Sequence, residues 1–450
     1  MRRIMNGIIC FASTLLICMS LLFAVCALIP QSGIRQGCLD SEAYFSANEG
    51  FPLLFEKNLG SRLDNYADAA LINVIYNVDS AKPLYTMIAA PYYRIEGNDI
   101  QSDLHSAVVD GLAPNNEYAR YWHGSQVLLR PLLTFTSVTG CRMILFVLLL
   151  ALNAVLAYLL IRQRALRPLL IYIASLLVVQ FWMTAFTLEY IMTFLVTAGV
   201  CIAAAVCVRR DLPAEIFRQR MTCIFIVSGA ATCFLDFLTT ETISFTVPFL
   251  LVMMLHKESG CDRLSLKKTL SLLFTWGAAW LAAYAAMFLV KWILVLLVLG
   301  KEAFLGVFSS AAYRIDRSVA SPGSPASSTV FTSRLPMMLA RNLGCLFPVS
   351  SQLTVTFILL TTLGILLLLG AVFYLFRGKR VDGAFIAGQL LTGCIPYLRF
   401  LALSSHAHDH YFFTYRAQIA TVMALLAVMA YSLKPSEVLG SGKKKRRRKT

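Results

Sequence analysis

The chain has 450 residues, of which 58% are hydrophobic and 14% are charged, and its mean hydropathy is +0.68. Soluble domains, which need bury only one face of each element, are far less apolar, so the composition excludes that class. Runs of about 20 apolar residues, enough to cross a hydrocarbon core of about 30 Å, recur along the sequence. We therefore predict an all-α polytopic membrane protein.

The apolar runs predict about ten transmembrane helices, beginning near residues 7, 143, 168, 190, 221, 243, 269, 352, 383 and 414. These divide the chain into a first helix (1–30), a large first loop (31–142), helices 2–7 (143–299), a second loop (300–351), helices 8–10 (352–433) and a basic tail (434–450). The first run also fits a signal peptide, but its length and poor cleavage site favour an uncleaved anchor.

The net charge of +16 is a topology signal, because Lys and Arg in short loops stay in the cytoplasm. Ten spans place every basic cluster, and both termini, on the cytoplasmic side of a bacterial plasma membrane. Both long loops are then extracytoplasmic. The basic tail is expected to contact anionic membrane lipids. No aromatic interleaving or binding module indicates nucleic acid.

Within the first loop, apolar residues at helical spacing predict a helix from Asp64 to Tyr76. Asp64 and Asp68 are four residues apart and share one face of it. A carboxylate in a partly dry pocket can act as general base toward a hydroxyl, and a second can orient it or help to hold a divalent cation. The alternative is a solvated helix face.

A second cluster precedes the next span and contains Arg120, Tyr121, Trp122 and His123. Arg and His beside aromatic rings at the membrane surface suit a phosphate with a sugar stacked nearby. An aromatic belt with a snorkelling arginine explains the same pattern.

A third cluster lies near the last span, where three of the six histidines occupy five residues. Alternate histidines can ligate zinc, but a cationic phosphate pocket fits the flanking arginines better. Its members are Arg399, His406, His410, Tyr415 and Arg416. Glu189, Asp236 and Glu241 stand at outer turns between spans, where carboxylates indicate function, although Asp236 also suits a helix cap.

The second loop contains a Ser- and Pro-rich stretch, 321–328, which is typical of a connection without packing. Apolar segments at 304–312 and 335–346 flank it, each with an arginine nearby. They predict two helices lying along the membrane interface.

The segments LDNYADA, ARYWHG, FLDFLTTE and SSHAHDHYFFTYR together resemble a group of uncharacterised polytopic membrane proteins of Gram-positive bacteria. The layout is also similar to glycosyltransferases of the GT-C class, which have a large first external loop and use polyprenyl-phosphate-linked sugars. That resemblance implies Asp64 or Asp68 as the base and Arg120, Arg399 or Arg416 as phosphate ligands. The acidic dipeptide typical of the class is absent.

The leading hypothesis is therefore an inverting transfer of a sugar from a polyprenyl-phosphate donor to an extracytoplasmic glycan or wall polymer. Asp68 or Asp64 would be the base, and the cationic clusters would bind the leaving phosphate. A transporter or flippase for a lipid-linked or anionic solute is the alternative, as is an acyltransferase that uses the histidines. The interiors of the spans are nearly free of charge, with Lys291 the conspicuous exception.

Overall fold

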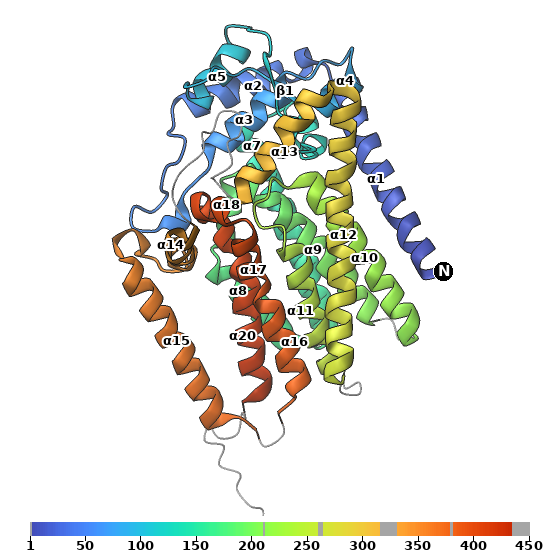
Figure 1. The fold of residues 1–450 in the computed structure, drawn as a ribbon, viewed down its shortest axis with the longest axis vertical. Helices are drawn as coiled ribbons and strands as arrows, with labels where there is room; N and C mark the ends of the chain where they lie inside the picture. Colours follow the sequence, from blue (N-terminus) through green and yellow to red (C-terminus); the bar gives the residue numbers. More distant parts are fainter. Residues whose placement is uncertain (1, 210–211, 260–263, 316–330, 379–380, 434–450) are drawn as a thin grey trace, which may run out of the picture.

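The computed structural model describes residues 2–209, 212–259, 264–315, 331–378 and 381–433. This part of the chain is mostly helical with almost no sheet, and most helices lie side by side in one bundle (Figure 1). The basic tail and the Ser- and Pro-rich stretch lie outside the described residues. The prediction of an all-α multi-pass membrane protein is confirmed.

Among the described residues, seven helical segments are long and apolar enough to cross a membrane. They are α1 (Arg2–Leu28), α7 (Val138–Arg162), α9 (Leu188–Arg209), α12 (Leu266–Leu299), α15 (Val355–Phe376) and the last two predicted spans, each built of several helices. The remaining predicted spans correspond to α8 (Leu166–Val178), α10 (Ala214–Leu235) and α11 (Ile243–Glu258), which lie in the same bundle. The total of ten spans stays a prediction.

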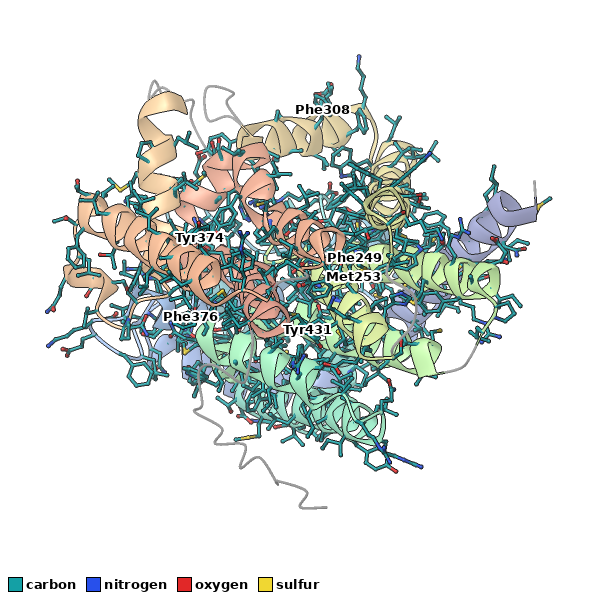
Figure 2. The ribbon with its side chains drawn as sticks, turned by 90° about the horizontal axis from the view of Figure 1, so that it is seen from below. Phe249, Met253, Phe308, Tyr374, Phe376 and Tyr431 are labelled. Carbon is teal, nitrogen blue, oxygen red and sulfur yellow. The ribbon has the colours of Figure 1, made fainter. Side chains whose placement is uncertain are left out.

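The centre of the bundle is formed by α11, in which every residue from Ile243 to Leu255 is buried. In the view from below, Phe249 and Met253 lie in the middle of the molecule (Figure 2). Helix α12 has 34 residues, about 50 Å at 1.5 Å per residue, so it extends beyond a hydrocarbon core as its long apolar run predicts. Ser265 begins it by accepting a hydrogen bond from the backbone of Lys268.

The first loop folds into a small unit at one end of the bundle (Figure 1), which we call the first-loop domain. It comprises α2 (Gln31–Ser46), η1 (Leu59–Ser61), α3 (Asn65–Tyr76), α4 (Pro83–Ala89), β1 (Pro91–Tyr92), α5 (Ile100–Val108), β2 (Asn116–Glu117) and α6 (Gln126–Leu132). The two short strands pair antiparallel, Pro91 opposite Glu117 and Tyr92 opposite Asn116. The predicted helix is α3, and Asp64 is its N-cap.

Two buried basic residues attach the first-loop domain to the bundle. Lys291 of α12 donates to the carbonyls of Met87 (3.2 Å) and Ile88 (2.7 Å) near the end of α4. Arg130 donates to the carbonyls of Ile29 and Ile75, just after α1 and in the last turn of α3. Both satisfy carbonyls that a helix end leaves without partners.

The second loop contains α13 (Lys301–Ile315), α14 (Phe331–Gly344) and η3 (Ser350–Gln352), so both predicted segments are helical. Their position along the membrane interface stays a prediction. Both lie toward the end of the bundle that carries the first-loop domain (Figure 1). After them, α15 stands at the edge of the bundle, and Ile358 is the single buried residue in its range. Its exposed apolar side chains suit contact with lipid.

The last two predicted spans are interrupted helices rather than continuous ones. The first breaks at Cys394, where Pro396 follows, and the histidine-rich segment forms short turns of helix before the second. The elements are α16 (Gly383–Gly393), α17 (Ile395–Ala402), α18 (Ser404–Asp409), α19 (Tyr411–Thr414), η4 (Tyr415–Gln418) and α20 (Ile419–Ser432). A further short turn, η2 (Phe181–Ala185), joins α8 to α9.

Candidate functional site at the first-loop domain

Asp68 connects three helices from a fully buried position. Its carboxylate accepts from Nε (2.9 Å) and Nη2 (2.6 Å) of Arg142 in α7. It also accepts from the backbone N–H groups of Leu188 (2.9 Å) and Glu189 (3.3 Å) in the first turn of α9. A carboxylate at a helix N-terminus also interacts favourably with the helix dipole. Asp68 is thus fully engaged in holding α3, α7 and α9 together.

Asp64 is also buried, at 3% exposure, but its carboxylate accepts fewer hydrogen bonds than that of Asp68. One carboxylate oxygen accepts from the backbone N–H of Ala67 (2.8 Å), as an N-cap does. Burial raises the pKa of Asp64 to about 7, the charge of Asp68 adds to the rise, and the Ala67 hydrogen bond opposes it. The interpretation of Asp64 and Asp68 as a solvated helix face is therefore wrong.

Glu189 completes a buried carboxyl pair with Asp64. The two side chains interact directly, and Glu189 is 8% exposed. Its Oε2 atom is buried without a hydrogen-bond partner in the described structure. Two adjoining buried carboxyl groups resist simultaneous ionisation, so the pair holds one proton more readily than none.

A second acidic group, Asp236, lies in the link between α10 and α11. It contacts Thr193, which is one turn along α9 from Glu189. Thr193 donates to Asp236 (2.7 Å), and the backbone N–H of Thr239 donates to the same carboxylate (3.0 Å). Asp236 therefore orders its own turn rather than capping α11. Burial, with the neighbouring charge of Glu241, raises the pKa of Asp236 to about 6.

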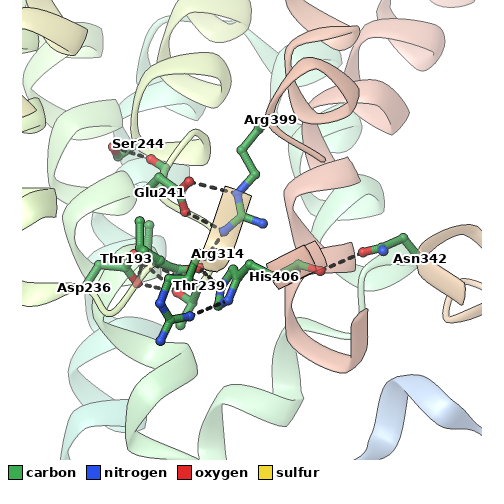
Figure 3. Close-up of polar contacts among 11 residues, drawn as sticks. Thr193, Asp236, Thr239, Glu241, Ser244, Arg314, Asn342, Arg399 and His406 are labelled. Atoms are coloured by element: carbon green, nitrogen blue, oxygen red, sulfur yellow. Dashed lines mark hydrogen bonds and ion pairs between the residues drawn. The ribbon is translucent and has the colours of Figure 1, made fainter. Parts of the chain in front are cut away.

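The same link joins α17 through a buried ion pair (Figure 3). Arg399 donates to both carboxylate oxygens of Glu241, at 2.8 and 3.3 Å, and to the carbonyl of Leu238 at 2.6 Å. Its Nη1 atom is buried and has no partner in the described structure. The guanidinium thus keeps the two N–H donors of Nη1 for a further acceptor.

His406 is held in a single tautomer between two fixed groups. Arg314 of α13 places Nη1 2.6 Å from Nδ1 of His406, while Nε2 lies 2.8 Å from the carbonyl of Leu238 (Figure 3). Because arginine only donates, Nδ1 accepts and Nε2 carries the proton. Burial and the nearby positive charges hold the pKa of His406 well below its usual range. His406 is neutral and supplies no charge to a phosphate.

Arg416 and Tyr415 attach η1 of the first-loop domain to the bundle through hydrogen bonds. Arg416 donates to the carbonyl of Gly60 (3.1 Å), which Tyr415 also approaches at 3.2 Å. A Cβ at Gly60 would lie 2.7 Å from the carbonyl of Cys345, so glycine alone fits. The Arg416 guanidinium covers the ring of Tyr190 at 4.4 Å, beside Glu189, and its Nε has no partner within the described chain.

The aromatic segment before α6 divides between the site and the core. Arg120 stacks on Tyr118 (4.4 Å) and Tyr121 (5.3 Å). Burial raises the pKa of Tyr121, and the charge of Glu189 adds to the rise. Trp122 instead donates to the carbonyl of Met287 (3.0 Å) and packs against α12.

His123 is buried with a φ of +53° and lies 2.9 Å from the carbonyl of Tyr118 through Nε2. Burial lowers the pKa of His123 to about 3. An imidazole with that pKa carries no positive charge near pH 7, and a role for His123 at a leaving phosphate stays a prediction. The ring centre of His410 lies 5.2 Å from that of Phe413, on which it stacks, and 4.6 Å from that of His406.

Several buried polar atoms in this region lack a partner within the described residues. They are Tyr121 Oη, Thr187 Oγ1, Glu189 Oε2, Thr240 Oγ1, Arg62 Nε, Arg399 Nη1 and Arg416 Nε. Buried polar atoms are rarely left unsatisfied, since each costs about 1–3 kcal/mol. Their concentration where the first-loop domain meets the bundle therefore indicates a site for a polar ligand.

Three arginines of this region were not predicted from the sequence as candidate site residues. Arg142 lies within an apolar run, where a charged side chain indicates a buried partner of opposite charge. Arg62 and Arg341 both lie against the ring of Tyr411, at 5.8 and 5.3 Å. Neither forms an ion pair with a carboxylate in the described part of the chain. Among the described residues, these two guanidinium groups therefore place positive charge beside the site.

No group of three or more His, Cys, Asp or Glu residues within the described ranges is arranged to hold a metal ion. The geometry defines a multi-pass helical membrane protein with a buried acidic and cationic site beneath its first-loop domain. No known protein family, curated protein or solved structure matches the chain.

Proposed function

We propose that the protein is an integral-membrane glycosyltransferase that moves a sugar from a polyprenyl-phosphate donor to an extracytoplasmic acceptor. The observation that carries the proposal is a buried carboxyl pair, Asp64 and Glu189, close to Arg416. The Arg416 guanidinium covers Tyr190, the chain neighbour of Glu189, and its Nε has no partner within the described residues. Transfer from a phosphate needs a base for the acceptor and positive charge for the leaving group.

In the proposed reaction, Asp64 takes the proton of the acceptor hydroxyl. A base is most effective when its pKa lies near the working pH, and burial raises the pKa of Asp64 to about 7. The acceptor oxygen bonds to the anomeric carbon, the bond from that carbon to the phosphate oxygen breaks, and polyprenyl phosphate leaves with the electron pair. A single displacement inverts the anomeric centre.

The leaving phosphate is assigned to arginines. Arg416 and Arg399 each keep a nitrogen without a partner within the described residues. Arg62 and Arg341 lie against Tyr411, and neither pairs with a carboxylate from that part of the chain. Guanidinium groups bind phosphate oxygens through paired hydrogen bonds. Asp68 has a positioning role, because its carboxylate is occupied by Arg142 and α9.

A transporter for a lipid-linked or anionic solute is the second candidate. The interruption of the last two spans beside the site favours it, since transporters place binding sites at broken helices. Lys291 does not, because it is bonded to carbonyls of the first-loop domain. The acyltransferase hypothesis is the weakest, because both ring nitrogens of His406 are occupied.

The test is mass analysis of surface glycans from a deletion strain that carries the wild-type chain, Asp64→Asn or Asp110→Asn at matched expression. Asp110 is an exposed carboxylate of the first loop and serves as the control. We expect wild type and Asp110→Asn to restore one sugar that Asp64→Asn does not. Full restoration by Asp64→Asn would refute Asp64 as the base.

A further inference from the structure

A polar pocket of about 540 Å³ opens on the first-loop domain, apart from the buried carboxyl pair. Pockets of this size accommodate small-molecule ligands. Its lining includes Asn77, Asp79, Lys82, Tyr85, Asn115 and Glu117. They come from the end of α3, from α4 and the turn before it, and from the β2 region, so the pocket depends on the folded domain.

The walls of the pocket are fixed by hydrogen bonds. The hydroxyl of Tyr85 donates to Glu117 (2.8 Å), which joins α4 to β2. Asn115 accepts from the backbone N–H of Arg94 (2.9 Å). Asn77 donates to the side chain and the carbonyl of Asn73, both at 2.9 Å. A pocket with bonded walls loses little entropy when a ligand binds.

The chemistry of the lining selects a ligand with many hydroxyl groups. Lys82 and the Asn115 amide supply donors, whereas Asp79 and Glu117 supply carboxylate acceptors. Neighbouring hydroxyls of a sugar both donate and accept, so they need this mixture. Two carboxylates against one ammonium group disfavour a phosphate-bearing or otherwise anionic ligand. The ring of Tyr85 is 40% exposed and offers a flat apolar face.

Aromatic rings connect this pocket with the buried site. Glu117 is followed by Tyr118, whose ring centre lies 5.7 Å from that of Tyr92 and 5.9 Å from that of Tyr121. Tyr92 and Tyr118 are partly exposed, whereas Tyr121 reaches the neighbourhood of Glu189. These ring contacts therefore link the wall of the pocket to the buried region, where Tyr121 is 3% exposed.

We propose that this pocket binds a neutral oligosaccharide, which is the acceptor of the transfer. The acceptor assignment rests on the proposed function, whereas binding itself does not. The pocket holds sugar units distant from the reacting end, so that binding energy from a remote part of the acceptor positions its hydroxyl.

The experiment uses oligosaccharides released from the cell surface, separated into neutral and anionic fractions and fluorescently tagged. Their retention is measured on the full-length protein in nanodiscs. We expect wild type to retain a neutral fraction and Tyr85→Ala or Glu117→Gln to weaken that binding at least about tenfold, the effect of losing a hydrogen bond and a ring contact. Tyr85→Phe, which keeps the ring, should bind more tightly than Tyr85→Ala.

Tyr374→Ala is the matched control, because Tyr374 is an exposed tyrosine on α15. Unchanged thermal unfolding midpoints in the pocket variants establish that they fold. Retention of only the anionic fraction, of no fraction, or equal retention by the pocket variants would overturn the proposal. Asp64→Asn should bind the neutral fraction normally, so lost transfer with intact binding separates the catalytic residue from the pocket.

Discussion

At the scale of single residues, the structure gives the two aspartates of the first loop different roles. Four hydrogen bonds engage Asp68, from Arg142 and from the start of α9. Asp64 is bonded to one backbone N–H and adjoins Glu189. The spacing of the two aspartates predicted that both lie on one helix face. It did not indicate that Arg142, 74 residues after Asp68, would pair with Asp68.

This difference predicts opposite behaviour of two conservative variants. Asp68→Asn leaves the buried Arg142 without its anion, and breaking a buried pair costs about 3–5 kcal/mol. We expect a lower thermal midpoint and less folded protein, with near-normal turnover per folded molecule. Asp64→Asn should instead keep the wild-type midpoint and lose transfer. Identical stability of both variants would contradict the assignment.

The raised pKa of Asp64 predicts a pH dependence in two observables. The folded chain retains a proton on Asp64 that the unfolded chain releases above its ordinary pKa of 3.8. Its stabilising contribution is therefore complete below about pH 4 and is lost as the pH rises through about 7. The proposed base must be ionised, so transfer should rise about tenfold per pH unit below 7 and level off above it.

Rates and unfolding midpoints measured between about pH 5 and 9 check both statements, with activity corrected for the folded fraction. In Asp64→Asn, the part of the stability profile that belongs to this group should disappear. A transfer rate that falls as the pH rises toward 7 would exclude a carboxylate base with this pKa.

At the scale of elements, helix ends and links determine what meets at the site. Apolar residues at helical spacing predicted α3, and apolar segments with an arginine nearby predicted the helices of the second loop. Neither pattern indicated that η1 would insert beside α19 and η4, because the determinants are the close approach at Gly60 and long-range hydrogen bonds from Tyr415 and Arg416. Such contacts leave no periodic trace in the sequence.

Lys291 offers a test at this scale. Its ammonium group satisfies two carbonyls at the end of α4. Replacing it by methionine retains much of the side-chain length but leaves those carbonyls unsatisfied, at about 1–3 kcal/mol. We expect Lys291→Met to lower the thermal midpoint, whereas Lys301→Met, at an exposed position one residue after α12 and its cap, should not. Equal midpoints would show that Lys291 does not attach the first-loop domain.

The arginines around Tyr411 give a second prediction for elements, because Arg62 belongs to the first-loop domain and Arg341 to α14. Arg62→Gln and Arg341→Gln should each raise KM for a polyprenyl-phosphate donor about tenfold while kcat changes little, the signature of lost ground-state binding. Arg377→Gln is the control, since Arg377 covers Tyr374 at the end of α15 remote from η3. An unchanged KM in both variants would remove these residues from the donor site.

At the scale of the whole molecule, composition predicted the class and charge distribution predicted one face for the site. The structure brings the acidic, aromatic and cationic clusters to the end of the bundle that carries the first-loop domain. Sequence alone did not separate the groups that face a ligand from those that hold helices together. Trp122, His123 and Asp68 illustrate why, because their roles depend on partners from distant helices or on burial.

The central claim is that Asp64 and Glu189 serve transfer of a sugar from a lipid carrier. Its most direct test incubates the purified protein, in proteoliposomes, with the polyprenyl-phosphate-linked sugars and acceptor glycan extracted from the deletion strain. The quantities measured are free polyprenyl phosphate and glycan product. We predict that wild type forms them in equal amounts and that Asp64→Asn forms neither. Movement of the lipid-linked sugar across the bilayer with no product, or equal turnover by both proteins, would contradict the claim.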